Sequence, residues 1–343
     1  METDVKTDTA AHATTIPGLV LRPYAGEADI PAIARIQNAE WKADGLKART
    51  SHDELAAEYG QVSAGFDPAR DIRIAVVDGT AVGFCMRDWA DATDGVREYR
   101  SRGYMEPAWR RRGIGTALLA DAGKRARDLA RSHETDRPRI QGTISNDTNP
   151  GAAALAERFG FARARWFFDM ERPLPADLPD IGPLPAGIDV RTATQGDVRA
   201  IWDADHEAFR DHWGGHDSSD ANLRRWTSAP EFDPSLFILA WDGDDIAAGV
   251  LNAIYPWENE ELGIQRGWLD SVFTRRPWRR RGLARSLIVR SLHLLRERGM
   301  TSAALGVDAD NPSGALGLYE SAGFAVTEKT TAWRKPLEEG PFT

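Results

Sequence analysis

Cysteine is almost absent from this chain, and so are long apolar runs. Cys85 is the only cysteine among 343 residues, which excludes an internal disulfide and a zinc site built from several thiolates. It lies in the apolar run 81–86, where we expect a buried and unreactive strand residue. No stretch of 18 apolar residues occurs, so a membrane-spanning helix is not expected. This composition fits a protein of the reducing cytoplasm.

Positive charge is also in deficit. The chain carries 43 Lys and Arg against 52 Asp and Glu, a formal net charge of -9. This balance argues against long-range attraction to nucleic acid or to an anionic membrane, so any run of arginines indicates a local anion site. Residues 1–18 are polar and lack the apolar segment of a signal peptide, and we expect them to form a disordered tail.

A repeated arginine-glycine motif is the most informative feature that is present. The run Arg110-Arg111-Arg112-Gly113-Ile114-Gly115 recurs at 279–284, a separation of 169 residues (279 minus 110), as Arg279-Arg280-Arg281-Gly282-Leu283-Ala284. The chain exceeds the usual size of one hydrophobic core. We therefore expect two domains, at 19–171 and 188–337, joined by an extended proline-rich linker at 172–187.

Hydrophobic periodicity predicts the same order of elements in both halves. In the first half we expect strands at 19–22, 72–77, 81–89, 99–105 and 139–145, and helices from residue 27, over 52–59, after the arginine loop and over 150–159. In the second half we expect strands at 188–191, 236–241, 246–255, 268–274 and 303–307, and helices at 195–209, 219–226, from the loop to 299 and at 313–321. Each half closes with a Gly-Phe turn, so the fold class is α/β, with two mixed sheets flanked by helices.

The loop between strand and helix suits a pyrophosphate. Free backbone N–H groups gather at a helix N-terminus together with partial positive charge. Glycine at 113, 115 and 282 lets a phosphate approach the main chain, and the neighbouring arginines add charge-assisted hydrogen bonds. Each loop is preceded by a Trp and followed by an amphipathic helix, a strand and an Asn-Pro pair. A single loop of this kind could be a solvated turn, but its repetition in the same context favours a binding site.

These motifs resemble those of the GNAT N-acetyltransferase superfamily, whose signature Q/R-x-x-G-x-G/A is matched in both halves. The resemblance covers nearly the whole chain and implies two acyl-CoA-binding domains, a two-domain plan that mycothiol synthases share. It implies that acyl-CoA is bound by Met105, Arg110, Arg111, Arg112, Gly113, Ile114, Gly115, Thr116, Asn149, Val272, Phe273, Thr274, Arg279, Arg280, Arg281, Gly282, Leu283, Ala284, Arg285 and Asn311.

The two halves differ where the family places its proton donor. Four residues before the glycine of the Gly-Phe turn stands Tyr319 in the second half and Ala156 in the first. In such enzymes a Tyr hydroxyl protonates the departing CoA thiolate, which a methyl group cannot do. We therefore expect the second half to be catalytic and the first to bind acetyl-CoA for structure or regulation.

A base and an acceptor site complete the expected chemistry. The amine must be neutral to attack the thioester, and the resemblance implies that a main-chain N–H near Val272 and Phe273 stabilises the carbonyl oxygen. Asp270, on the same strand, is the first candidate for the base, followed by Glu258 and Glu261.

The segment around 211–217 is histidine-rich. The Gly-Gly pair at 214–215 argues against a preformed metal site, and acetyl transfer needs no metal, so none is expected. In the family this loop lines the acceptor pocket. His212, Trp213 and His216, with Glu258, are therefore expected to contact the acceptor.

The expected function is transfer of an acyl group, most simply acetyl from acetyl-CoA, to a small-molecule amine, by a cytoplasmic monomer or homodimer. A thiol-cofactor precursor is one acceptor to consider, and antibiotic biosynthesis or resistance is another setting. Two alternatives remain: a non-catalytic acyl-CoA sensor or assembly module, and a protein in which both halves act on different acceptors.

Overall fold

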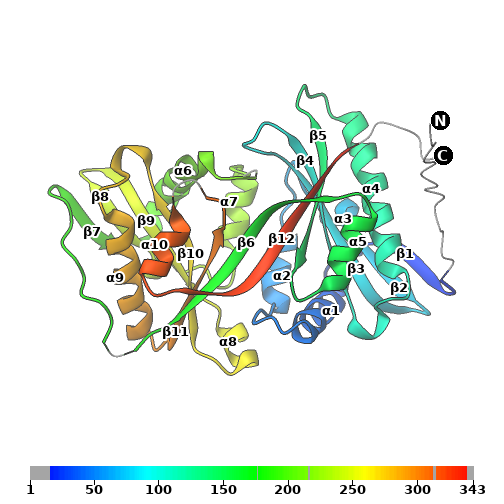
Figure 1. Ribbon diagram of the computed structural model, residues 1–343, viewed down its shortest axis with the longest axis horizontal. Coiled ribbons are helices and arrows are strands. Elements are labelled where there is room, and N and C mark those ends of the chain that lie inside the picture. Colours follow the sequence, from blue (N-terminus) through cyan, green and yellow to red (C-terminus); the bar gives the residue numbers. More distant parts are fainter. Residues whose placement is uncertain (1–15, 176, 215–216, 312–313, 338–343) are drawn as a thin grey trace, which may run out of the picture.

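Twelve strands form one continuous sheet across the whole molecule, as seen in the computed structural model, which describes residues 16–337 apart from 176, 215–216 and 312–313 (Figure 1). The strands are β1 (Leu19–Pro23), β2 (Ile72–Val77), β3 (Thr80–Asp91), β4 (Arg97–Met105), β5 (Arg139–Asn146), β6 (Ala162–Pro173), β7 (Ile188–Thr192), β8 (Ile238–Asp242), β9 (Asp245–Ile254), β10 (Arg266–Thr274), β11 (Ser302–Asp308) and β12 (Ala325–Pro336). Their order in the sheet is β1-β2-β3-β4-β5-β12-β6-β11-β10-β9-β8-β7. The expected mixed α/β class is confirmed, whereas the two expected sheets are joined into one. The disordered tail expected at 1–18 lies outside the described residues up to residue 15.

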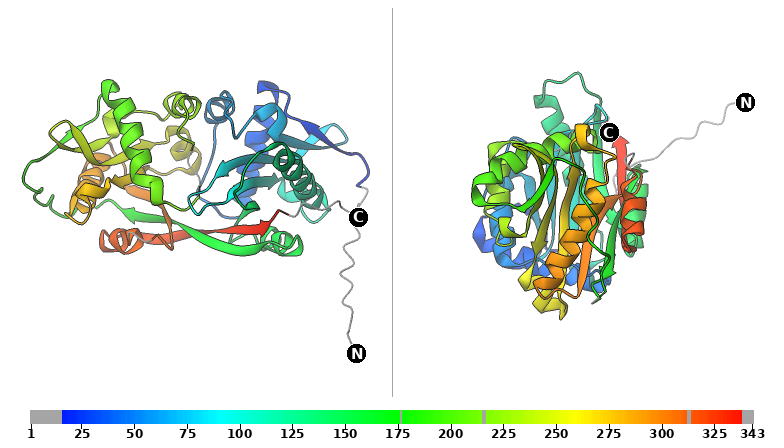
Figure 2. Two further views of the ribbon diagram at one scale, coloured as in Figure 1. Left: turned by 90° about the horizontal axis from the view of Figure 1, so that it is seen from above. Right: turned by 90° about the vertical axis from the view of Figure 1, so that its left-hand side faces the viewer.

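Helices lie against both faces of this sheet (Figure 2). The α-helices are α1 (Ile30–Ala43), α2 (His52–Tyr59), α3 (Pro68–Asp71), α4 (Ile114–Ser132), α5 (Pro150–Arg158), α6 (Val198–Ala208), α7 (Asp220–Thr227), α8 (Pro256–Leu262), α9 (Leu283–Glu297) and α10 (Ala315–Ser321). The longer ones begin and end within a few residues of the sequence prediction, whereas α8 falls in a segment for which no helix was expected. No helix in the described part of the chain is long and apolar enough to cross a membrane.

The last strands of the two sequence halves are exchanged. β6, which follows the first Gly-Phe turn, pairs antiparallel with β11 of the second half, with Met170 opposite Leu305. β12, the last strand of the second half, pairs antiparallel with β5 of the first, with Ala332 opposite Ile144. The two exchanged strands also pair with each other and cross the middle of the molecule (Figure 1). The sheet is therefore continuous because each half completes the other.

The exchanged strands contribute to the core of the opposite half. Met170 of β6 is fully buried among side chains of α9 and β11. Trp333 of β12 packs against Ala156 and Phe161 of the first half, and its indole N–H donates to the Ser145 hydroxyl at 2.9 Å. Full burial of one large apolar side chain stabilises a fold by about 1.5–3 kcal/mol, so both strands help to hold the halves together.

The expected proline-rich connector runs along the second half. After β6 the chain remains extended, and the Leu174 N–H donates to the Thr301 carbonyl at 2.8 Å. Leu174 and Leu178 join the core of the second half, and His293 of α9 hydrogen-bonds the Pro179 carbonyl at 2.9 Å. The connector is therefore held against α9 through the Pro175 and Pro179 carbonyls, which hydrogen-bond Arg296 and His293.

Two pairs of parallel strands separate part of the way along their length. β4 pairs with β5 only from Arg97 to Ser101, and β10 pairs with β11 only from Arg266 to Trp268. Beyond these points the amide groups of β4 and β10 that face the gap lose their neighbouring strand. An open, half-paired strand can accept an extended ligand by hydrogen bonding. Each half therefore presents one gap, next to its arginine-glycine loop.

The prediction for Cys85 is confirmed. Its side chain is buried in the core of the first half between β3 and α4, and burial raises the pKa of the thiol to about 12.

Candidate active sites

The two arginine-glycine loops have the same backbone conformation. Arg111 and Arg280 adopt φ values of 64° and 62°, in a left-handed region that non-glycine residues seldom occupy. Gly113 and Gly282 follow with φ values of 88° and 82° and form the N-caps of α4 and α9 without a side-chain cap. No side chain caps the first-turn amides of either helix, a conformation that suits an anion site at the helix N-terminus.

The larger cavity lies in the second half, in the gap between β10 and β11. Its volume is about 970 Å³, and it reaches from the loop at Arg280 and Gly282 to Tyr319 of α10. Of the residues expected to bind acyl-CoA here, the ones lining the cavity are Val272, Phe273, Thr274, Arg279, Arg280, Gly282, Leu283, Ala284, Arg285 and Asn311. Arg281 does not line it.

Asp270 lies where this cavity meets a second one. The register between β10 and β9 shifts between Leu269 and Ser271, so Asp270 sits on a bulge that redirects its side chain. It lines both the large cavity and a neighbouring cavity of about 290 Å³. A group at this position can reach reactants that enter from opposite sides.

The carboxyl group of Asp270 is held in a state suited to proton transfer. Asp270 is exposed where it lines the two cavities, and the surrounding protein desolvates its carboxyl group in part. This desolvation raises its pKa to about 7, while a hydrogen bond from the Tyr255 hydroxyl, at 2.9 Å, acts in the opposite direction. The nearby Glu231 carboxylate raises the pKa further. A base with a pKa near the operating pH is efficient.

Tyr319 of α10 lines the large cavity together with β10 residues. Its ring is 6% exposed and contacts Phe324 edge-on, with ring centres 6.3 Å apart. Among the residues that the structure describes, none forms a hydrogen bond with its hydroxyl group. Burial raises the pKa of Tyr319 to about 12, so the phenol stays protonated at neutral pH.

The smaller cavity combines aromatic and acidic side chains. Trp202 and Trp226 face each other with ring centres 5.6 Å apart, and Trp226 stacks on Phe237 at 5.7 Å. Asp205 and Glu231 line the cavity with Asp270. Sequence reasoning did not identify this set, because its members come from α6, α7, β9, β10 and the loop after α7, with no shared spacing.

The first half has a corresponding cavity of about 470 Å³ with different chemistry. Of the residues expected to bind CoA here, Met105, Arg110, Arg111, Gly113, Gly115, Thr116 and Asn149 line it. Arg112 stacks on Trp109 and Ile114 is buried in the core. At the position of Asp270, nine residues before the motif, stands Ser101, and Ala156 takes the place of Tyr319. The first half thus lacks counterparts of both Asp270 and Tyr319.

A carboxylate also occupies the open strand of the first half. Glu40 of α1 accepts a hydrogen bond from the Met105 N–H, the last amide of β4 that faces the gap. Burial raises the pKa of Glu40 to about 7. When the helices of the two halves are aligned at Ile33 and Ile201, the residue opposite Glu40 is Ala208. The second half therefore has no carboxylate at the corresponding position of its first helix.

The first arginine of each motif is held by protein groups. Arg110 forms a bidentate ion pair with Asp44, at 2.6 and 2.8 Å, and Asn149 donates to the same carboxylate at 3.0 Å. Arg279 donates to the main-chain carbonyls of Thr274 and Ala208, at 3.0 and 2.9 Å. Both guanidinium groups thus brace the loop against the preceding strand or helix, which differs from the phosphate contacts expected for them.

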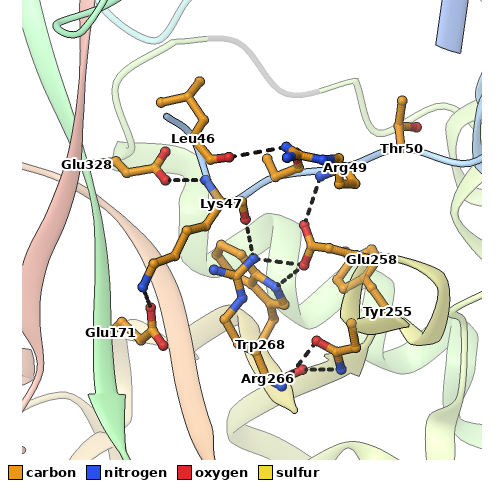
Figure 3. Close-up of polar contacts among 12 residues, drawn as sticks. Leu46, Lys47, Arg49, Thr50, Glu171, Tyr255, Glu258, Arg266, Trp268 and Glu328 are labelled. Carbon is orange, nitrogen blue, oxygen red and sulfur yellow. Dashed lines mark hydrogen bonds and ion pairs between the residues drawn. The ribbon is translucent and has the colours of Figure 1, made fainter. Parts of the chain in front are cut away.

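Glu258, a candidate base and acceptor contact, lies elsewhere. It forms a buried ion pair with Arg266 at 2.8 Å and accepts from the Arg49 N–H at 3.2 Å, while Arg266 also donates to the Lys47 carbonyl (Figure 3). Trp268 donates to Glu258 as well, at 3.3 Å. Glu258 does not line either cavity of the second half. Its role is to join the loop after α1 to β10, so the expectation of catalytic or acceptor contact is corrected.

The histidine-rich loop is only partly where the family resemblance placed it. His212 lines the large cavity, whereas Trp213 packs beneath the Arg334 guanidinium, 3.9 Å from the ring centre, and away from the smaller cavity. The Thr93 hydroxyl of the first half donates to the His212 carbonyl at 2.6 Å. His216 lies outside the described residues. In the described ranges, no three His, Cys, Asp or Glu side chains are grouped to hold a metal ion.

Two helix-capping loops, each beside an opened parallel strand pair, define a duplicated acyl-CoA-dependent transferase. Comparison with known proteins agrees. Residues 198–324 match the model of the "Acetyltransferase (GNAT) family" and residues 68–163 match that of the "Acetyltransferase (GNAT) domain".

Relatives and solved structures match over nearly the whole length. The mycothiol acetyltransferase of Geodermatophilus obscurus is 30% identical over 312 residues, 90% of this chain and 94% of that protein. A GCN5-related N-acetyltransferase from Sphaerobacter thermophilus superposes with a TM-score of 0.70 at 28% identity, covering 95% of this chain and 98% of the other. A tandem GNAT protein of the clavulanic acid biosynthesis pathway has the same TM-score at 16% identity, covering 95% and 100%.

The chain belongs to the GNAT acetyltransferase family, in its tandem form. It is an acetyl-CoA-dependent N-acetyltransferase similar to mycothiol acetyltransferase.

Proposed function

We propose that the second half alone catalyses acetyl transfer to a small-molecule amine, with Asp270 as general base and Tyr319 as general acid. The observation that supports this most directly is the position of Asp270 at the junction of the two cavities of the second half. Acetyl-CoA would occupy the larger cavity, with its diphosphate at the Arg280–Gly282 loop. The amine would enter through the smaller cavity.

The reaction then proceeds in balanced steps. Ionised Asp270 removes a proton from the ammonium group, and the neutral nitrogen attacks the thioester carbonyl carbon. A β10 amide near Val272 stabilises the negative oxygen of the tetrahedral intermediate. As the carbon–sulfur bond breaks, the Tyr319 hydroxyl gives its proton to the CoA sulfur, and the proton that the nitrogen still has to lose restores the phenol of Tyr319. The proton held by Asp270 then passes to solvent. The products are the N-acetylated amine and free CoA.

We propose that the first half binds CoA without turning it over. It keeps the loop conformation and the open strand, but Ser101 and Ala156 supply neither a base nor a proton donor. Glu40 competes with the ligand for the Met105 amide. A structural or regulatory site is the role that these groups support.

The acceptor is a small molecule, consistent with the name of the mycothiol acetyltransferase relatives. A thiol-cofactor precursor is therefore one acceptor to test. The clavulanic acid pathway protein gives a reason to include amines of secondary metabolism.

Replacement of the proton donor tests the catalytic assignment. Tyr319→Phe should lower kcat/KM for acceptor-dependent CoA release by about 10²–10⁴-fold, the usual contribution of a positioned general acid, while acetyl-CoA still binds in titration calorimetry. A variant that retains wild-type turnover would contradict the assignment.

Matched loop variants test which half is active. Arg280→Asn and Arg111→Asn remove equivalent side chains, and asparagine tolerates the left-handed backbone at both positions. We expect Arg280→Asn to raise the KM for acetyl-CoA about ten- to hundredfold, the worth of a charge-assisted hydrogen bond, and Arg111→Asn to leave it unchanged. Equal losses in the two variants would show that both halves turn over.

A further inference from the structure

The smaller cavity of the second half offers mainly hydrogen-bond acceptors to its occupant. The Tyr255 hydroxyl donates to Asp270 at 2.9 Å, and the Ser271 hydroxyl donates to Asp205 at 2.5 Å. The amide nitrogen of Asn252 donates to the Leu236 carbonyl and to the Ser291 hydroxyl. These donors are therefore already used within the protein.

Several acceptors in the same cavity have no partner. Asn252 is completely buried, and its side-chain oxygen has no hydrogen bond among the described residues; the same is true of one carboxylate oxygen of Glu231. Both residues line the cavity. A buried polar atom without a partner costs about 1–3 kcal/mol, so a ligand that supplies donors relieves a real cost.

The charge of the cavity has one sign. Three carboxyl groups line it, from Asp205, Glu231 and Asp270, and none of the lining residues is Lys, Arg or His. Desolvation is the largest cause that raises the pKa of all three, while the His206 ring, 3.9 Å from the Asp205 carboxylate and outside the cavity lining, acts in the opposite direction on Asp205. On the first half, Glu54 of α2 lies close enough to Glu231 to raise its pKa further.

The walls of the cavity also suit a cation. Trp202, Trp226, Phe232 and Phe237 line it, and an aromatic face attracts an ammonium group most strongly where water is excluded. The volume, about 290 Å³, lies at the lower end of ligand pockets, which span about 300–1,000 Å³. The occupant is therefore compact.

We infer that the acceptor is a compact amine with a second cationic group, a diamine or an aminoalkylguanidine, and that Glu231 anchors this second cation while Asp270 faces the reacting nitrogen. The inference rests on the proposed function, because it assigns the smaller cavity to the acceptor. One carboxylate suffices to deprotonate the reacting ammonium. Glu231 lines the cavity with Trp202 and Trp226, and no Lys, Arg or His lines it, so a second cationic group on the acceptor would pair with Glu231.

Four amines with a four-carbon chain and different end groups separate this acceptor class from others. With purified full-length protein and saturating acetyl-CoA, CoA release is measured for 1,4-diaminobutane, butylamine, 4-aminobutanol and 4-aminobutanoate. We expect kcat/KM for the diamine to exceed that for butylamine by about ten- to hundredfold, as one charge-assisted contact predicts, and the carboxylate to be the poorest. Equal or better use of butylamine or 4-aminobutanoate would overturn the inference.

A variant assigns the selectivity to one residue. Glu231→Gln keeps the size of the side chain and should reduce the diamine-to-butylamine ratio of kcat/KM to about one, through a higher KM for the diamine. Glu260→Gln, on the exposed face of α8 and outside both cavities, is the matched control and should keep the wild-type ratio. An unchanged ratio in Glu231→Gln would rule out this residue as the anchor.

Binding distinguishes a failed inference from a failed function. Titration calorimetry of 1,4-diaminobutane into wild type and Glu231→Gln requires no turnover, and we expect binding to wild type that weakens about ten- to hundredfold in the variant. Binding of this kind without acetyl transfer to any amine would refute the proposed function and leave the dication site standing. Acetyl transfer to other amines without diamine binding would refute the dication site and leave the proposed function standing.

Discussion

Removal of the Tyr255 hydroxyl should move the pH dependence of the reaction. Asp270 has a pKa of about 7, raised from 3.8 mainly by desolvation and lowered in part by the hydrogen bond from Tyr255. Only its ionised form accepts a proton, so wild-type kcat/KM should rise with pH through about 7. With this pKa, about one tenth of Asp270 is ionised at pH 6 and about nine tenths at pH 8, a nearly tenfold change.

Tyr255→Phe keeps the ring and removes the donor to the ionised carboxylate. A hydrogen bond to a charged group contributes about 1.5–3 kcal/mol, and one pKa unit corresponds to about 1.4 kcal/mol, so the pKa of Asp270 should rise by about one to two units. The acid limb of the kcat/KM profile should shift to higher pH by the same amount and approach the wild-type plateau above it. Tyr24→Phe, in the first half, is the control.

The assay is steady-state CoA release between pH 5.5 and 9.5, with profiles fitted to a single ionisation. An acid limb at the same pH in Tyr255→Phe as in wild type would refute the argument that this hydroxyl tunes the base. So would a limb near 7 that persists in Asp270→Asn, because the titrating group would then be another residue.

Two further perturbations address the first half and the contact between the halves. Glu40→Ala frees the Met105 amide, so acetyl-CoA should bind the first half about tenfold more tightly in native mass spectrometry. Wild type should gain this affinity below about pH 7, where Glu40 takes up a proton. A binding stoichiometry that neither change affects would contradict the competition between Glu40 and acetyl-CoA. Arg266→Met leaves Glu258 buried without its counter-charge and should lower the free energy of unfolding, measured in urea, by about 3–5 kcal/mol. The double variant Arg266→Met/Glu258→Leu should recover most of this stability. Equal losses in the single and double variants would be inconsistent with a buried ion pair.

The repeat made much of the fold predictable. The interval between the two arginine-glycine runs shows which residues of the two halves correspond. Alternating or helical periodicity of apolar residues predicts most of the strands and helices. The loop conformation followed as well, because Gly113 and Gly282 stand where a helix begins and a left-handed residue is needed. These are local properties, which the sequence of a short segment determines.

The exchange of β6 and β12 could not be predicted in this way. Both strands follow a Gly-Phe turn in equivalent halves, so either of them could complete β5 or β11 by the same backbone hydrogen bonds. The choice depends on long-range packing, such as the burial of Trp333 against Ala156, which no local pattern records.

The candidate site was predictable only in part. The position of Tyr319 came from its spacing to the Gly-Phe turn, and Asp270 from its strand. Glu258 was misassigned because an acidic residue near a cavity is indistinguishable in sequence from one that pairs with a buried Arg266. Glu40 could have been found by aligning the first helices of the halves, where it stands opposite Ala208; no comparable signal exists for Glu231.

The crossed terminal strands give this single polypeptide the connectivity of a two-fold dimer whose subunits have traded their final segments. A cut in the connector would yield two fragments, each carrying a piece that the other lacks. Neither fragment would be a self-sufficient enzyme, and activity would return only when both are mixed. Duplication has thus made each copy depend on the other for the last strand of its part of the sheet.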